Sequence, residues 1–122
     1  MRSTAVLVLA GDDEKGLVDG ILQLGLSALT RKTMDQALTA LRHESLAAIV
    51  VDREEADVDA LEFALNVRDV DEETPVLVIR DTTSSGDDDA LRLVPHTFLV
   101  SRGDTPEQLA EGLAAALEVA EG

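Results

Sequence analysis

Charged and hydroxyl side chains follow four short apolar runs in this sequence, and their types suit metal binding or nucleophilic chemistry. They are Asp12 and Asp13 after the first run, Asp52 after the second, Arg80 after the third, and Ser101 with Arg102 after the fourth. A group of carboxylates suits a hard divalent cation such as Mg²⁺, because that ion prefers oxygen ligands. An aspartate can also act as a nucleophile, since carboxylates form acyl-phosphates.

The four apolar runs must position these side chains, and each is short and largely β-branched or aliphatic. They cover residues 5–9 (AVLVL), 47–51 (AAIVV), 76–79 (VLVI) and 98–100 (FLV), and a weaker candidate lies at 27–30. Continuous apolar runs of this length are typical of strands buried on both faces, as in a parallel sheet. We therefore expect five parallel strands.

Apolar residues recur at helical spacing between these runs. The predicted apolar faces are Leu17, Ile21, Leu22 and Leu24 in a first helix, Ala37, Leu38 and Leu41 in a second over 35–43, and Leu61 with Leu65 in a third, where Phe63 and Val67 lie to one side. Residues 82–89 predict a loop, which a short helix over 90–94 follows until Pro95 ends it.

The last helix has the clearest signals. Pro106 suits the first helical position, and Asp104 or Thr105 before it suits the cap. Its predicted buried stripe consists of Leu109, Leu113, Ala116 and Leu117.

This alternation predicts an α/β fold of the flavodoxin-like kind, in which a doubly wound, five-stranded parallel sheet lies between two helical layers. A length of 122 residues fits a single domain over 1–122. Ligands of such sheets bind outside the carboxyl ends of the strands. We therefore expect Asp52, Arg80 and Ser101 to converge on one edge of the sheet.

Composition excludes several classes of protein. The chain has no cysteine, which excludes disulfides, cysteine-based zinc sites and thiol nucleophiles. Its formal net charge of −15 repels nucleic-acid phosphates, so we expect no direct binding to nucleic acid. No apolar run approaches the length of a membrane span or a signal-peptide core, so we expect a cytoplasmic protein without membrane contact.

Several local patterns resemble the receiver domain of bacterial two-component response regulators. The run AAIVVD ends with Asp52, where that family places its phosphorylated aspartate, and 58–63 (VDALEF) is similar to the start of its third helix. Residues 74–79 (TPVLVI) are similar to its proline-led fourth strand, Phe98 matches an aromatic position of the fifth strand, and 104–113 resembles the last helix.

The resemblance implies a CheY-like fold and a role in phosphorelay signal transduction rather than enzymatic catalysis. A histidine kinase would transfer a phosphoryl group to Asp52 with the help of Mg²⁺. The resemblance also implies that the added charge alters a surface around the fourth helix, the fourth strand and the fifth strand, with Phe98 as the packing element that reports the change.

Several positions depart from the family pattern, and these departures indicate a pseudo-receiver. The acidic pair at the end of the first strand would fall near Leu9 and Ala10, Arg80 stands in place of a threonine or serine, and Ser101 stands in place of a lysine, with Arg102 next to it. These departures put three functions of the family pattern in question. They are metal binding by the acidic pair, the contact of the threonine or serine hydroxyl with the phosphate, and phosphate binding by the lysine.

Each candidate residue therefore keeps two interpretations. Asp52 is either a phospho-acceptor or a structural carboxylate at a strand end. Asp12 and Asp13 either join Asp52 in binding Mg²⁺ or form a solvated loop and helix cap. Arg80 either pairs with Asp52 in place of the metal, as a guanidinium can with two parallel hydrogen bonds, or extends into solvent.

Two classes of function remain open on the sequence. In the first, the chain is an interaction module that binds a histidine kinase or another signalling protein, or forms a homodimer through its fourth helix, fifth strand and fifth helix. In the second, it is a flavodoxin-like small-molecule-binding domain or an enzyme unrelated to phosphorelay. An absorbance scan separates the two, because a bound flavin or cobalamin would contradict the signalling interpretation.

Overall fold

Five parallel strands form a single sheet in the order β2-β1-β3-β4-β5. The computed structural model describes residues 5–9, 15–52, 59–71, 73–80, 87–101 and 106–121. The strands are β1 (Ala5–Leu9), β2 (Ser27–Arg31), β3 (Ala48–Asp52), β4 (Val76–Arg80) and β5 (Thr97–Ser101). The doubly wound parallel sheet that the sequence predicts is confirmed, including the weak strand at its edge.

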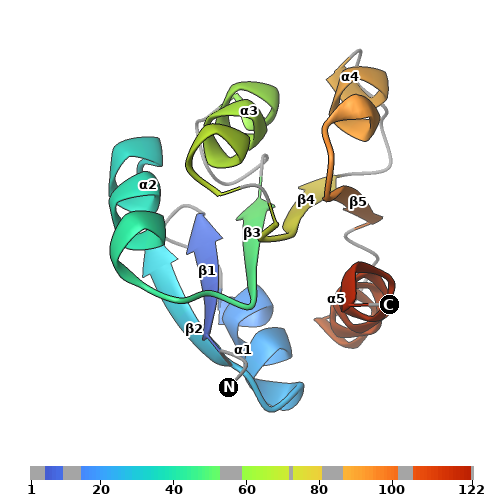
Figure 1. Cartoon of the computed structure of the whole chain (residues 1–122). Helices are drawn as coiled ribbons and strands as arrows, with labels where there is room; N and C mark the ends of the chain where they lie inside the picture. The colour runs from blue at the N-terminus through green and yellow to red at the C-terminus, as the bar shows by residue number, and fades with distance from the viewer. Residues whose placement is uncertain are drawn as a thin grey trace.

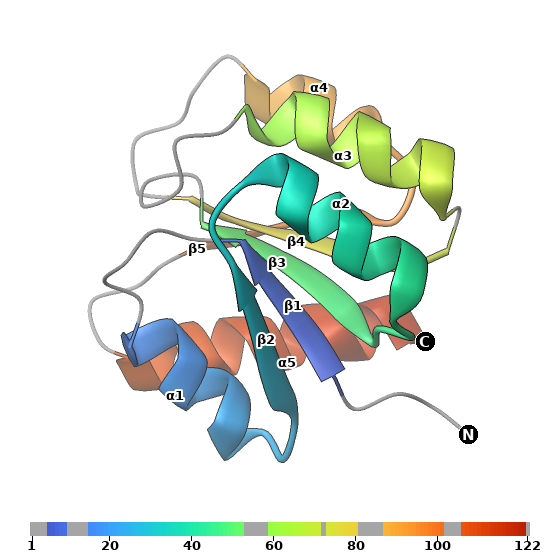
Figure 2. The ribbon, with the colours of Figure 1, turned by 90° about the vertical axis from the view of Figure 1, so that its left-hand side faces the viewer.

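Helices cover both faces of this sheet and produce three layers. They are α1 (Lys15–Gln23), α2 (Met34–His43), α3 (Ala60–Val70), α4 (Asp87–Leu93) and α5 (Pro106–Glu121). Figures 1 and 2 show α1 and α5 on one face and α2, α3 and α4 side by side on the other. Among the described residues, no helix combines the length and the apolar character that crossing a membrane requires.

The core consists of two apolar clusters, one on each face of the sheet. Leu7, Ile49 and Val51 join the helices α2, α3 and α4 in the first cluster, whereas Val8 and Val50 join α1 and α5 in the second. Alternate residues of a strand point to opposite faces, so a strand covered on both sides is apolar throughout. Every residue of β3 is buried, which explains the unbroken AIVV run that leads to Asp52.

The buried stripe of α3 differs from the predicted one. The residues that face the sheet are Ala60, Phe63, Ala64 and Val67, whereas Leu65 is 51% exposed. These four positions recur at the spacing of one helical face, and the two alanines let the helix approach the sheet closely. The prediction followed the leucines, whereas the face that packs against the sheet combines one large side chain, Phe63, with three smaller ones.

The fourth helix begins earlier than predicted, at Asp87 instead of residue 90, and it ends at Leu93. Three consecutive aspartates suggested a loop, because aspartate is a poor residue for helix interiors. In a first turn, however, carboxylates interact favourably with the positive end of the helix dipole, so the same residues can begin a helix. In the first helix, Leu22 was predicted on the buried face together with Leu17 and Ile21, but it is 52% exposed, so this part of the prediction is wrong.

Candidate functional site at the carboxyl edge of the sheet

Asp52 is the last residue of the central strand β3. Its side chain is only 1% exposed, which is unusual because a carboxylate normally remains in water unless it has partners. Asp52 does have an interaction partner in the folded chain. β3 has a strand on each side and helices on both faces of the sheet. This explains why even its last residue, Asp52, is buried.

Arg80 and Ser101 end the two strands that follow β3 across the sheet. Arg80 is the last residue of β4, Ser101 is the last residue of β5, and the two are partners in the strand register. Asp52 pairs with Ile79, one residue before Arg80. The backbone therefore brings Asp52, Arg80 and Ser101 to the carboxyl edges of three adjacent strands, as expected from the sequence. The side chains of Arg80 and Ser101 lie outside the described part of the structure.

The other neighbour of Asp52 across the sheet is apolar. Leu9 ends β1, pairs with Val51 of β3, and is completely buried in the cluster beneath α2 and α3. This is the strand end near which the resemblance to receiver domains would place an acidic pair. A leucine in the core supplies no oxygen ligand.

The remaining predicted site residues lie outside the described residues. These are Asp12 and Asp13, proposed as Mg²⁺ ligands with Asp52, and Arg102, the neighbour of Ser101. In the described part of the chain, no three aspartate, glutamate or histidine side chains gather to hold a metal ion. Asp52 and the buried Leu9 supply a single carboxylate between them, which does not make a magnesium site by itself.

A hollow of about 460 Å³ lies between α4, β5 and α5, against the first residues of β5 instead of its carboxyl end. Arg92 of α4 and Phe98 of β5 line it, together with the small residues Gly112, Ala115 and Ala116 of α5. Phe98 is partly exposed, so its ring contributes apolar surface that a partner can reach. The side chains around the hollow combine an aromatic ring, small residues and one cation.

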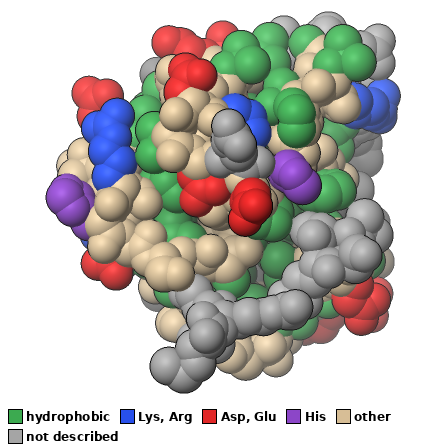
Figure 3. All heavy atoms as spheres, viewed as in Figure 1, with side chains coloured by type: hydrophobic (Ala, Val, Ile, Leu, Met, Phe, Trp, Pro, Cys, Tyr) green, Lys and Arg blue, Asp and Glu red, His purple; other side chains and the backbone are tan. Residues whose placement is uncertain are grey.

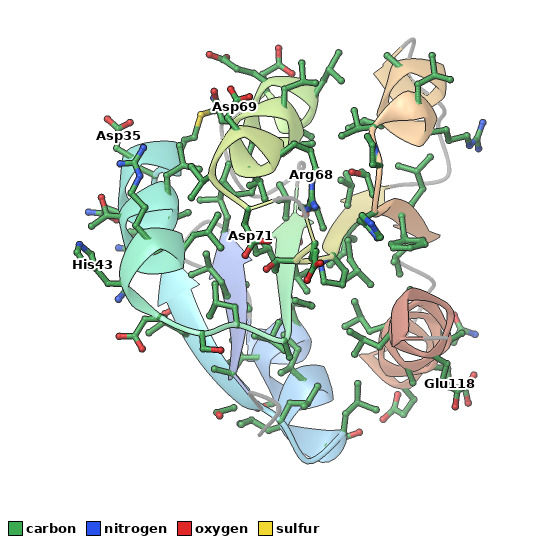
Figure 4. The ribbon with its side chains drawn as sticks, in the orientation of Figure 1. Asp35, His43, Arg68, Asp69, Asp71 and Glu118 are labelled. Atoms are coloured by element: carbon green, nitrogen blue, oxygen red, sulfur yellow. The ribbon has the colours of Figure 1, made fainter. Side chains whose placement is uncertain are left out.

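A polar cluster that the sequence did not predict lies in the turn from α3 to β4. Asp71 accepts hydrogen bonds from the backbone N–H groups of Glu73 (2.8 Å) and Thr74 (2.9 Å) and from the hydroxyl of Thr74 (2.6 Å). Arg68 of α3 donates to the carbonyl oxygen of Thr74. Arg68 and Asp71 can be followed in Figure 4. Aspartate side chains in turns often accept a hydrogen bond from the backbone two residues on, as Asp71 does from Glu73, and this tendency could have indicated the cluster.

Charge and burial shift the pKa values of Arg68 and Asp71 in opposite directions. Burial lowers the pKa of the Arg68 guanidinium, and the negative charge of Asp71 partly offsets this effect. Burial alone would raise the pKa of Asp71, but the three hydrogen bonds and the charge of Arg68 outweigh it and hold the pKa below its usual value. Asp71 is therefore ionised in the folded protein and stabilises this turn.

Structures of known proteins match this fold over nearly its whole length. A response regulator receiver protein from Sinorhizobium medicae has a TM-score of 0.73 at 16% identity, with 97% of each chain covered. The chemotaxis response regulator CheY4 of Vibrio cholerae has a TM-score of 0.75 at 19% identity, covering 95% of this chain and 99% of its own.

A third match carries a metal ion. The receiver domain of the sensor histidine kinase PA1611 from Pseudomonas aeruginosa, which has a magnesium ion coordinated in its active-site cleft, has a TM-score of 0.76 at 12% identity, covering 95% of this chain and 98% of its own. No protein-family model matches the sequence, and no curated protein is detectably similar to it. Strand order, layers and these matches together establish that the chain has the CheY-like α/β fold of response-regulator receiver domains.

Proposed function

We propose that this chain is the receiver domain of a two-component response regulator, spanning 1–122, in which Asp52 holds the phospho-acceptor position of an atypical active site. In this proposal it is a cytoplasmic protein-interaction module rather than an enzyme, and its binding surface does not depend on a phosphate. The observation that carries the proposal is a buried carboxylate at the end of the central strand of a receiver fold, where ligands of such sheets bind.

The residues around Asp52 support the loss of metal-dependent phosphoryl transfer. Leu9 occupies the neighbouring strand end and offers no ligand for Mg²⁺. Arg80 ends β4 without the hydroxyl that would contact a phosphoryl oxygen, and Ser101 ends β5 without the ammonium group that would balance its charge. Because these described residues do not fit a magnesium ion, we assign no chemical step to one.

Arg80 takes the place of the metal in this proposal. Its backbone lies on the strand next to Asp52, one position beyond the register partner of Asp52. A guanidinium can donate two parallel hydrogen bonds to a carboxylate, and it stays charged at every physiological pH. Such a pair would neutralise Asp52 permanently and hold one conformation of the edge.

The partner would bind at the hollow between α4, β5 and α5. Phe98 and the small residues of α5 provide apolar surface there, and Arg92 provides a positive charge at its rim. We propose that a histidine kinase, another signalling protein or a second copy of the chain uses this face. No nucleic acid is expected to bind directly, because the chain carries a net charge of −15.

Treatment with a small acyl-phosphate donor, with and without Mg²⁺, tests the proposal by intact-mass measurement. The parent chain should gain no phosphate, and an Asp52→Asn variant should behave identically. A receiver domain that retains the usual acidic pair, threonine and lysine serves as the positive control under the same conditions.

A contradictory outcome would be a single phosphate on the parent chain that requires Mg²⁺ and is lost in the Asp52→Asn variant. That result would establish Asp52 as a working acceptor and would overturn the phosphate-independent role, while leaving the receiver fold unaffected.

A further inference from the structure

Two leucines on adjacent helices are exposed to solvent to an unusual degree. Leu93, at the end of α4, is 85% exposed, and Leu65, in the middle of α3, is 51% exposed. Leu61 lies one helical turn before Leu65 and is only partly buried against the core. α3 and α4 lie side by side on the same face of the sheet (Figures 1 and 2).

Contacts of α3 establish which flank of this helix carries its leucines. The amide of Asn66 donates to the sulfur of Met34 in α2 at 3.4 Å, so Asn66 lies on the flank that faces α2. Consecutive residues of a helix are rotated by about 100°. Leu65 is therefore rotated away from α2, and Leu61 lies on the same side as Leu65, towards α4.

Contacts of α4 establish the orientation of Leu93 in the same way. Arg92 lines the hollow towards β5 and α5, and Leu91 is completely buried against the sheet. Leu93 follows Arg92 by another rotation of about 100°, so it lies about 200° from the buried Leu91 and points away from the sheet and from α5. Leu61, Leu65 and Leu93 thus belong to the outer surface of the α3 and α4 layer, and we call this surface the leucine face. Hydrophobic side chains gather over α3 and α4 in Figure 3.

The exposed charged residues one helical turn from Leu65 are both negative. Glu62 precedes Leu65 by three residues and Asp69 follows it by four, so both flank it on the surface of α3. The chain as a whole carries a net charge of −15 and has only two lysines among its ten basic residues. A second copy of the chain would bring the same carboxylates against this surface, and like charges across an interface oppose association.

We propose that the leucine face binds an amphipathic, basic helix of a partner protein. Apolar side chains of that helix would cover Leu61, Leu65 and Leu93, and its lysine or arginine residues would pair with Glu62 and Asp69. Exposed apolar patches with a polar rim mark interaction sites on soluble proteins. This surface is separate from the hollow beside Phe98, because Arg92 and Leu93 point to different flanks of α4.

A synthetic peptide of about fifteen residues, with leucines on one helical face and lysines elsewhere, serves as the probe. Its affinity for the parent chain is compared with that for a Leu65→Gln, Leu93→Gln double variant. Leu22→Gln is the matched control, since Leu22 in α1 is 52% exposed and belongs to the opposite face of the sheet. Amide chemical shifts of the labelled protein locate the peptide.

The proposal predicts that the double variant binds the peptide about tenfold more weakly or worse, whereas Leu22→Gln binds like the parent. The largest shifts should fall on α3 and α4, and a peptide with glutamate in place of lysine should not bind. Unchanged thermal midpoints of the variants establish that they fold.

Equal affinity of the double variant would overturn the proposal, as would shifts centred on Phe98 and α5. Self-association of the parent chain that the double variant abolishes would assign the face to a second copy and would overturn the choice of a basic partner. None of these outcomes depends on whether Asp52 accepts a phosphate.

Discussion

Asp71 shows how one carboxylate stabilises the connection that leads into β4. Its two oxygens accept three hydrogen bonds within a single turn, and Thr74, which donates two of them, is 8% exposed. Buried polar groups need such partners because water cannot reach them. The turn then places Val76 at the start of the strand that ends beside Asp52.

Removal of this side chain should destabilise the protein. Asp71→Ala leaves the two N–H groups and the hydroxyl of Thr74 without their acceptor, so we expect a loss of about 1 to 3 kcal/mol in the free energy of unfolding. Asp69→Ala is the control, since Asp69 is exposed two residues earlier and should change the stability by less than about 0.5 kcal/mol. Urea unfolding monitored by circular dichroism measures both, and equal effects would contradict the role of Asp71.

The depressed pKa of Asp71 also predicts a pH dependence. Because the folded pKa lies below that of the unfolded chain, its contribution is fully present above the unfolded value of about 3.9. The contribution is lost as the pH falls through the folded pKa. The difference in unfolding free energy between the parent and Asp71→Asn should therefore shrink as the pH falls below about 4. A difference that grows on acidification would contradict this sign.

At the scale of elements, α3 is positioned by the residues it buries against the sheet. Phe63 is completely buried, together with Ala64 and Val67, and Asp59 caps the helix by accepting from the N–H groups of Leu61 (3.0 Å) and Glu62 (3.2 Å). Capping and burial thus fix where the helix starts and which side faces the sheet. Because this side of the helix faces the sheet, Leu65 on the other side is exposed and forms part of the leucine face.

Truncation of two large residues of α3 should separate these roles. Phe63→Ala is expected to cost about 3 to 5 kcal/mol of unfolding free energy, because it opens a cavity in the core. Leu65→Ala should cost less than about 0.5 kcal/mol, since that side chain is half exposed. Thermal or chemical unfolding of both variants measures the contrast. Similar losses for the two would mean that the sheet-facing side of α3 is misassigned.

The sequence predicts the strands better than it predicts the helix faces. Runs such as AVLVL favour a strand covered on both sides, because they are apolar at every position, rich in valine and too short for a typical helix. In α3, two apolar faces competed, one with Leu61 and Leu65 and one with Phe63 and Val67, and the spacing of apolar residues does not decide between them. In α4, the aspartates at 87–89 could begin a helix or form a loop, and the tertiary contacts of Leu91 and Val94 decide between them.

The candidate site was predictable in position but not in detail. Strand ends fix where the backbones of Asp52, Arg80 and Ser101 lie, because parallel strands all end at the same edge. The burial of Asp52 depends on the neighbouring strands and helices that cover it, and a short stretch of sequence does not show how these elements pack. The roles of Asp12, Asp13 and Arg102 stay predictions, as they lie outside the described residues.

At the scale of the whole molecule, the charge is the dominant feature. A net charge of −15 on 122 residues makes the compact state repel itself. Salt screens such repulsion, with a Debye length that falls to about 8 Å at physiological ionic strength. The charge also favours basic partners over nucleic acids or a second copy of the chain.

Stability should consequently rise with ionic strength. Between low salt and about 0.5 M NaCl, we expect the thermal midpoint to increase by a few degrees as self-repulsion is screened. A calorimetric series in NaCl measures the effect, and sucrose at matched osmolality controls for effects unrelated to charge. A midpoint that falls with added NaCl would show that attractive ion pairs outweigh the repulsion.

A crystal structure grown with Mg²⁺ present tests the central claim most directly, since it reveals what lies against the Asp52 carboxylate. The account predicts the Arg80 guanidinium within hydrogen-bonding distance of Asp52 and no cation between them. An octahedral ion with oxygen ligands at about 2.1 Å, including Asp52, would contradict the account and would restore metal-dependent phosphoryl transfer as the function of this edge.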